Sequence, residues 1–272
     1  MFEYQYGKKE GSANIRLVNK KVGDRVKKVL ITGGSRGIGR ATTLQLAGSG
    51  MHVFINYKNN QQAAQLLVNE VNSAGGIATA LKGDIANESE VEELFQLIKT
   101  QYGELDYLVN NAGVLFQQCR TEDLTAERIN TVMATNVTGL LICCREFIKN
   151  ARNFNNFSHK AIVNVSSAAA RLGAAGEYVD YAASKGAVDT ITKGLSLELA
   201  ELGIRVNGVR PGYIYTEMHA DGGEANRVER IAKQLPMKRG GEPSEIAEII
   251  AWLLSDASSY VTGSIIDAAG GR

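Results

Sequence analysis

One regularity constrains the fold of this 272-residue chain more than any other: two kinds of segment alternate along it. From residue 28 onward, short apolar runs rich in β-branched residues are separated by longer segments in which apolar residues recur at helical spacing. The runs that we expect to form strands are KVLIT (28–32), HVFINY (52–57), IATALKG (77–83), LDYLVN (105–110), AIVNVS (161–166), IRVNGV (204–209) and SIID (264–267). This alternation is typical of a parallel sheet whose connections are helices. We therefore predict an α/β fold, a doubly wound, parallel, seven-stranded sheet with helices on both faces, in a single domain.

Residues 1–27 do not follow this alternation. They carry charges throughout and lack an apolar core, so we interpret them as a flexible N-terminal extension before a domain of residues 28–272, and not as a signal peptide or membrane span. We expect no later stretch to approach the length and apolarity of a spanning helix. With 30 basic and 29 acidic side chains the net charge is +1, which argues against nucleic acid and membrane as partners and favours a small molecule.

The cysteines and histidines indicate neither a metal site nor a triad. Cys119, Cys143 and Cys144 form no CxxC pair and no Cys/His spacing suited to zinc. The three histidines are scattered along the chain. We therefore predict no metal, no Ser-His-Asp triad, and free thiols that fit a reducing cytoplasm.

A glycine-rich stretch, TGGSRGIG (32–39), follows the first expected strand and opens a helical segment. Glycine at such a turn lets the backbone approach a pyrophosphate, whose charge is favoured at a helix N-terminus. In doubly wound sheets such ligands lie at the carboxyl ends of the strands, where the winding reverses. The sequence thus predicts a Rossmann-type dinucleotide site that uses Gly33, Ser35, Arg36, Gly37, Ile38 and Gly39.

The residues after the second expected strand indicate which dinucleotide is bound. An acidic side chain near this point holds the ribose of NAD, whereas a basic neighbour accommodates the 2′-phosphate of NADP. Here Asn56, Tyr57 and Lys58 offer no acid, and Arg36 in the glycine-rich loop is a second cation able to reach the same phosphate. We predict NADP(H) as the cofactor, with NAD(H) possible.

The glycine-rich stretch, with five more matches, gives the chain a resemblance to the short-chain dehydrogenase/reductase family from residue 28 to residue 271. TGGSRGIG resembles the TGxxxGxG loop of that family. The other matches, which follow in the family's order, are NNAG (110–113), Asn136 in MATNVTG, the serines of IVNVSS, YAASK (181–185) and PGYIYT (211–216). Membership would imply a Rossmann-type fold and an oxidoreductase that acts on CH–OH or C=O groups with a nicotinamide cofactor.

The resemblance implies that Tyr181 is the general acid/base and that Lys185 assists it. Carbonyl reduction needs a proton for the developing alkoxide, and a tyrosine titrates near ~10 unless a neighbour shifts its pKa. Residues four apart share one helix face, so we expect the Lys185 ammonium to lower the pKa of Tyr181. Lys185 would also hold the nicotinamide ribose.

The catalytic serine has two candidates. The family's serine often lies thirteen residues before the tyrosine, where this chain has Ala168. We infer one extra residue in the intervening loop and assign the role to Ser167, which would donate to the substrate oxygen. Ser166 is the alternative.

The remaining site residues follow from the resemblance alone. Asn136 would organise a water that links Lys185 to solvent. Asp84 would contact the adenine, with Ile85 beside it. The other residues expected to line the nucleotide are Asn110, Ala112, Gly113, Pro211, Gly212, Ile214 and Thr216.

The substrate stays open at this level. We expect it to be set by the segment 217–243, interpreted as a polar, mobile lid, and by the loop before Tyr181. Sugar (glucose) 1-dehydrogenases and 3-oxoacyl-carrier-protein reductases are the relatives that the pattern resembles; a catalytically silent NADP sensor is a third reading. The family also implies a homotetramer, with a homodimer open.

Overall fold

The computed structural model describes residues 25–157 and 159–272, so most of the predicted extension lies outside the described residues. Its core is a parallel sheet in the order β3-β2-β1-β4-β5-β6-β7, which confirms the predicted doubly wound α/β fold. The strands are β1 (Lys28–Ile31), β2 (His52–Tyr57), β3 (Ile77–Lys82), β4 (Tyr107–Asn110), β5 (Lys160–Val165), β6 (Ile204–Pro211) and β7 (Ile265–Ala268). Each lies within two residues of its predicted position, because a strand buried on both faces must be a nearly continuous apolar run.

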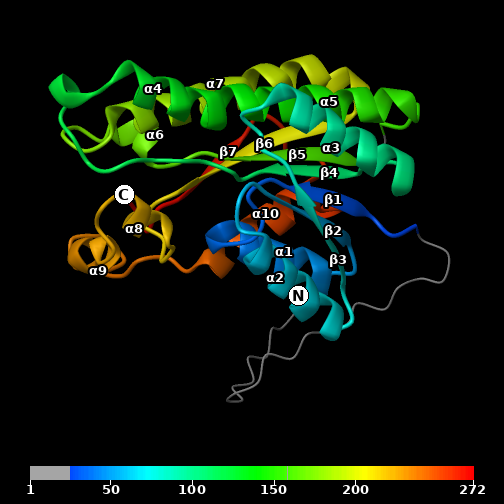
Figure 1. The fold of residues 1–272 in the computed structure, drawn as a ribbon, viewed down its shortest axis with the longest axis horizontal. Coiled ribbons are helices and arrows are strands. Elements are labelled where there is room, and N and C mark those ends of the chain that lie inside the picture. Colours follow the sequence, from blue (N-terminus) through cyan, green and yellow to red (C-terminus); the bar gives the residue numbers. More distant parts are fainter. Residues whose placement is uncertain (1–24, 158) are drawn as a thin grey trace, which may run out of the picture.

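Helices cover both faces of the sheet (Figure 1). On one face the apolar side chains pack with α1 (Gly37–Gly48), α2 (Gln61–Ser73) and α10 (Pro243–Leu254). The other face is covered by α3 (Glu88–Gln101), α4 (Ala126–Met133), α5 (Leu140–Asn153) and α7 (Val179–Leu199). The short helices are α6 (Ala169–Leu172), α8 (Met218–Asp221), α9 (Arg227–Ala232) and the 3-10 turns Thr121–Asp123, Ala200–Leu202 and Asp256–Ser258.

The winding of the sheet reverses between β1 and β4. From β1 the chain builds outward through β2 to β3, then returns to add β4 on the opposite side. The helices that follow β1 and β4 pack on opposite faces of the sheet, and doubly wound proteins bind ligands at the carboxyl ends of the strands beside such a point. Helices α8 and α9 stand over the same edge of the sheet (Figure 1).

One continuous helical run differs from the expectation that no stretch resembles a membrane span. Residues Ala126–Asn153, which join α4 and α5 through a π-helical segment (Ala134–Gly139), are long and apolar enough by length and composition to cross a membrane. In the structure Phe147, Cys143 and their neighbours on α5 are buried in the core between this helix and the sheet. The apolar content of this run therefore reflects its place as a core helix.

Candidate active site

A cavity of about 800 Å³ opens at the carboxyl ends of the strands. Loops after β1 to β6 line it together with α8 and α9. It brings together Gly33, Ser35, Arg36, Gly37, Ile38, Asn56, Tyr57, Lys58, Asp84, Ile85, Ala112, Gly113, Ser167, Tyr181, Lys185, Pro211, Gly212, Ile214 and Thr216. Three other residues that we expected at the site, Gly39, Asn110 and Asn136, lie behind the cavity wall.

The glycine-rich loop forms one wall of this cavity. Gly33 and Gly37 have φ of +60° and +50°, a backbone conformation that favours glycine. A Cβ at Gly39 would lie 2.3 Å from the carbonyl oxygen of Gly33, so this glycine permits close packing and does not itself face the ligand space. Helix α1 begins at Gly37 without a side-chain cap, which leaves its first N–H groups available to an anion. The loop fits a dinucleotide pyrophosphate.

The two cations expected near the 2′-phosphate both border the cavity, and each is paired with an exposed or partly exposed acid. Arg36 lies 2.7 Å from Asp221 of α8, and Lys58 lies 2.7 Å from Asp84. Such exposed pairs contribute little to stability and exchange readily with an incoming anion. Asn56 also lines the cavity, and its buried amide donates to the carbonyl of Gly83 (2.9 Å), which links β2 to the end of β3.

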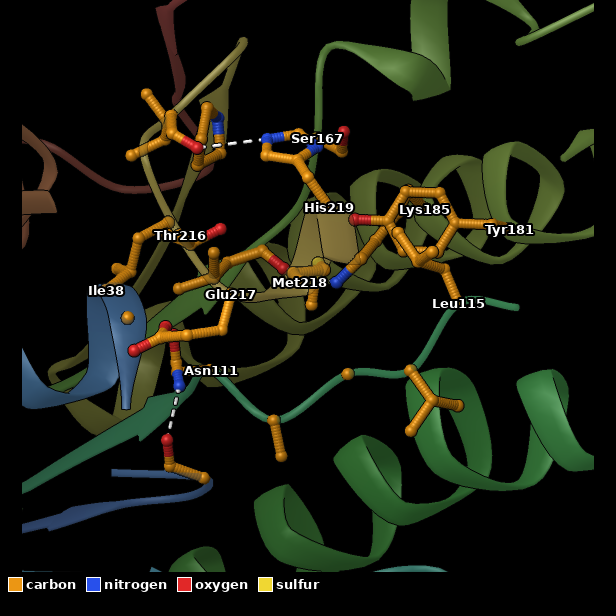
Figure 2. Close-up of a pocket in the computed structure, with 18 of the residues that line it drawn as sticks. Ile38, Asn111, Leu115, Ser167, Tyr181, Lys185, Thr216, Glu217, Met218 and His219 are labelled. Carbon is orange, nitrogen blue, oxygen red and sulfur yellow. Dashed lines mark hydrogen bonds between the residues drawn. The ribbon is translucent and has the colours of Figure 1, made fainter. Parts of the chain in front are cut away.

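The first asparagine of NNAG is a core residue, whereas we expected it to line the nucleotide. The amide of Asn110 donates to Asn164 Oδ1 at 2.9 Å inside the sheet. Its neighbour Asn111, which sequence reasoning missed, lines the cavity and donates to the carbonyls of Thr32 and Gly33, both at 3.0 Å (Figure 2). The alternation of side chains along a strand explains the exchange, because adjacent residues point to opposite sides.

Tyr181, Lys185 and Ser167 meet on the wall opposite the glycine-rich loop. Helix α7 places the tyrosine and lysine one turn apart, and the Lys185 Nζ lies 5.6 Å from the centre of the Tyr181 ring (Figure 2). The Lys185 ammonium donates to the carbonyl of Val165, the last residue of β5, at 2.8 Å. Ser167 lies beside Tyr181, close enough for its hydroxyl to lower the pKa of the tyrosine. The arrangement gathers two hydroxyls and one ammonium at a single point of the cavity.

The pKa of Tyr181 is shifted in the opposite direction from the one that we expected. Burial raises the pKa of Tyr181 to about 12, although the Ser167 hydroxyl lowers it. Burial also lowers the pKa of Lys185 to about 8, against the attraction of Asp189. The net shift of the Tyr181 pKa is therefore opposite to the one expected, because desolvation of the phenol outweighs any lowering by the Lys185 ammonium. Tyr181 is held as a neutral phenol, the form that can donate a proton.

The two candidate serines point in different directions. Ser166 is buried, and its hydroxyl donates to the backbone carbonyl of Lys185 at 3.2 Å. Ser167 accepts a hydrogen bond from the backbone N–H of Ala169 at 3.1 Å and lies beside Tyr181. This geometry favours Ser167 as the substrate-facing serine, and it gives Ser166 the task of fixing α7 against β5.

Asn136 is buried in the π-helical segment between α4 and α5. Its amide exchanges two hydrogen bonds with the backbone of Val114, at 2.8 and 3.0 Å, and donates to Ser184 Oγ at 3.0 Å. Ser184 in turn donates to the carbonyl of Tyr181 at 2.7 Å. Asn136 thus braces the loop after β4 against α7; Ser184, the fourth letter of YAASK, was missed because a small residue there reads as a spacer.

The segment after β6 folds over the cavity and is fastened there by Arg227. This buried guanidinium lies 2.5 Å from Glu177, on the loop before Tyr181, and 3.2 Å from Glu224. It also stacks between the rings of Tyr178 and Tyr213. We expected a mobile polar lid, yet the segment carries a buried ionic anchor. The contact with Glu177 left no signal in the sequence, because that residue lies 50 positions before Arg227.

Apolar side chains surround Tyr181 on the substrate side. Tyr181 packs with Leu115, from the loop after β4, and with Tyr178, and Met218 of α8 lies against them. Among residues 25–157 and 159–272, no group of three or more His, Cys, Asp or Glu side chains is placed to hold a metal ion.

Comparison with known proteins places this site in context. A family model described as enoyl-(acyl carrier protein) reductase matches residues 33–272. The chain is 60% identical to the uncharacterized oxidoreductase YgfF of Escherichia coli over 243 residues, which cover 89% of this chain and 98% of that protein. It is 36% identical to a 3-oxoacyl-[acyl-carrier-protein] reductase of Synechocystis, over 89% of this chain and 95% of that one. A short-chain dehydrogenase of Burkholderia cenocepacia, solved in complex with NADP, superposes with a TM-score of 0.82 at 30% identity, over 90% and 97% of the two chains.

Proposed function

The chain belongs to the short-chain dehydrogenase/reductase family, and we propose that it is an NADP(H)-dependent oxidoreductase that interconverts a carbonyl and a secondary alcohol. The observation that carries this proposal is the convergence of Tyr181, Ser167 and Lys185 on one wall of the cavity, opposite the glycine-rich loop. A nicotinamide cofactor bound in this cavity would supply or accept the hydride.

The proposed catalytic roles follow from the state of each side chain. Tyr181 donates its proton to the carbonyl oxygen during reduction, because burial keeps the phenol protonated at neutral pH. Ser167 donates a hydrogen bond to the same oxygen and stabilises its developing charge. Lys185 holds a positive charge beside the Tyr181 ring, so it stabilises the phenolate left after proton transfer. Asn136 positions α7 through Ser184.

Two observations support NADP(H) over NAD(H). No acidic residue follows directly on β2, and Lys58 and Arg36 both border the cavity near that point. In addition, a relative at 30% identity was solved with NADP bound. In this structure Lys58 pairs with Asp84, and Arg36 pairs with Asp221. Both acids are partly exposed, so a phosphate dianion can compete with them for the two cations.

The cofactor proposal is tested with Arg36→Ala and Lys58→Ala, and Arg40→Ala is the matched control. Arg40 is also a cation of the α1 region, but it pairs with Glu70 on the surface. We expect each of the first two variants to lower kcat/KM for NADPH by about 10-fold, with little change for NADH. Equal use of NADH and NADPH by the parent protein would contradict the proposal.

A second candidate activity is 3-oxoacyl-carrier-protein reduction, favoured by the name of the relative at 36% identity. Sugar dehydrogenation remains the other candidate, and a silent NADP sensor the third. A panel of ketones, sugars and acetoacetyl thioesters, assayed with NADPH or NADP, distinguishes them. We expect turnover of at least one carbonyl; cofactor binding without turnover of any compound would support the sensor.

We also propose that the protein acts in the cytoplasm as a homotetramer or homodimer. The free cysteines Cys119, Cys143 and Cys144 support a reducing compartment. Exposed apolar side chains on two long helices, Leu141 on α5 and Leu197 on α7, support association between copies of the chain. Sedimentation of the purified protein tests the assembly.

A further inference from the structure

Helix α8 places a histidine, His219, in the substrate half of the cavity. In Figure 2 its ring lies in the same close-up as Ser167 and Tyr181, and all three residues line the cavity. Its neighbour Met218 packs against the apolar cluster that contains Tyr181, which fixes the helix over the reacting end. We assigned this histidine no role from the sequence.

The hydrogen bond of the His219 ring determines which nitrogen carries the proton. The Nε2 atom lies 2.9 Å from the backbone carbonyl of Ile214 (Figure 2). A carbonyl oxygen only accepts, so the proton sits on Nε2 and the Nδ1 atom carries a lone pair. Ile214 is itself buried and fixed by a bridge to Gly241, so the ring is held in this orientation.

Burial, more than the charges around it, disfavours the charged form of the His219 ring. Burial lowers its pKa; the Ile214 carbonyl, Glu224 and Glu229 oppose this, whereas Arg227 adds to it. Glu224 and Glu177 are both bound to Arg227. No hydrogen bond among the described residues uses the Nδ1 atom, and His219 lines the cavity, so this lone pair is available to a substrate there.

The polar groups of the substrate half thus form a complementary set. Tyr181 and Ser167 present hydroxyls to the reacting oxygen, and His219 presents an acceptor beside them. Resting on the function proposed above, we propose that His219 Nδ1 accepts a hydrogen bond from a hydroxyl next to the reacting carbon, so that the site takes α-hydroxy ketones and the matching vicinal diols.

The same acceptor disfavours a 3-oxoacyl thioester as the substrate. A 3-oxoacyl thioester carries only carbonyl oxygens beside its reacting ketone. If such an oxygen faced His219 Nδ1, two hydrogen-bond acceptors would meet and neither would have a donor. A buried polar group without a partner costs about 1–3 kcal/mol. A site built to bind a substrate hydroxyl rejects analogues that lack it more strongly than an apolar site rejects an added one.

The experiment compares acetoin with butanone, two ketones that differ by one hydroxyl, in NADPH-dependent reduction. For the parent protein we expect kcat/KM to be at least about 10-fold higher for acetoin, since one hydrogen bond of this kind contributes about 1.5 kcal/mol. In His219→Leu the ratio should fall toward one, chiefly through a higher KM for acetoin. His219→Gln, whose amide offers a donor and an acceptor close together, should keep part of the ratio.

Met218→Leu is the matched control, because it changes the neighbouring side chain without removing an acceptor. General damage to the segment over the cavity would lower kcat/KM for both ketones together and would leave the ratio of the two values unchanged. A ratio near one in the parent protein, a ratio unchanged in His219→Leu, or an acetoacetyl thioester preferred to acetoin would each overturn this inference. Turnover of butanone without a hydroxyl preference overturns the inference alone, whereas no turnover of any ketone overturns the proposed function with it.

Discussion

The sheet holds a buried tyrosine and a buried lysine at each of its two ends. At the amino end Tyr107 begins β4 and Lys160 begins β5. At the carboxyl end Tyr181 and Lys185 lie on α7, with the lysine bound to the last residue of β5. Burial raises the pKa of both tyrosines to about 12 and lowers the pKa of both lysines. A shifted pKa therefore does not by itself distinguish a reactive group from a structural one.

The two ends differ in what surrounds the lysine. Lys160 Nζ lies 2.8 Å from the buried carboxylate of Glu104, whose pKa burial would raise but Lys160 holds low. For Lys185, no carboxylate lies within ion-pair distance among the described residues, and Asp189 nearby is bound to Arg210. Only the carboxyl end opens into the cavity. The comparison teaches that an uncompensated buried charge facing a cavity, and not burial alone, marks the site.

We expect the largest difference between the two ends when each lysine is replaced by methionine. Lys160→Met leaves Glu104 buried with weaker compensation, so the free energy of unfolding should fall by about 3 kcal/mol while turnover changes little. Lys185→Met removes an ammonium that has no carboxylate partner, so stability at neutral pH should stay equal or rise. Reduction of acetoin should nevertheless fall by about 1,000-fold. Urea unfolding and steady-state kinetics on both variants provide the readouts.

Loss of turnover in Lys160→Met comparable with that in Lys185→Met would remove the distinction between the two ends. A stability loss in Lys185→Met as large as that in Lys160→Met would do the same.

The serines at the end of β5 sharpen the comparison within the carboxyl end itself. Ser167→Ala removes the hydroxyl beside Tyr181, and we expect kcat to fall by about 100-fold with stability unchanged. Ser166→Ala removes the hydrogen bond to the Lys185 carbonyl, which should cost about 1 kcal/mol of stability and leave kcat within a few-fold. If Ser166→Ala instead abolishes turnover and Ser167→Ala does not, the assignment of the serines is reversed.

Stability against pH tests the state of Lys185 directly. Its pKa is about 8 in the folded protein and 10.5 as an ordinary lysine, so between these values the unfolded chain binds more protons than the folded one. The free energy of unfolding of the parent protein should therefore rise relative to that of Lys185→Met between pH 8 and 10, by roughly 2 kcal/mol. Below pH 8 the difference should be constant. A parallel pair of curves over the whole range would contradict the lowered pKa.

The smallest expected effect is a change in NADPH affinity when the acid paired with Arg36 is neutralised. At the amino end Arg25 pairs with buried acids, whereas Arg36 pairs with the half-exposed Asp221. Asp221→Asn should free Arg36 and tighten NADPH binding by about 2-fold, since an exposed pair contributes at most about 1 kcal/mol. Glu70→Gln, which frees Arg40 away from the cavity, should leave binding unchanged. Fluorescence titration of NADPH measures both, and equal effects would show that Arg36 is not close to the cofactor.

Most of the fold could be predicted because each strand is a buried apolar run and each connection a helix. The placement of Tyr181, Lys185 and the glycine-rich loop along one cavity could also be predicted, because each motif consists of residues that are close in sequence. These are local patterns, and the sequence displays them directly.

The parts that could not be predicted depend on contacts between distant segments. The motif NNAG does not show which asparagine is buried in the sheet, because a shift of one residue in the strand register moves each side chain to the opposite face. His219 and Arg227 sit in a polar stretch without periodicity, and their partners Ile214 and Glu177 are assigned only by the folded lid. The pKa of Tyr181 was misjudged because burial, which the sequence does not show at that position, outweighed the lysine.

The most direct test removes the hydroxyl from each buried tyrosine in turn. Tyr181 and Tyr107 have the same direction and size of pKa shift, so Tyr107→Phe is a matched control for Tyr181→Phe. In NADPH-dependent reduction of acetoin, we expect Tyr181→Phe to lower kcat by about 1,000-fold and Tyr107→Phe to leave it within a few-fold. Turnover retained by Tyr181→Phe, or lost equally in both variants, would contradict the assignment of the reaction to the carboxyl end of the sheet.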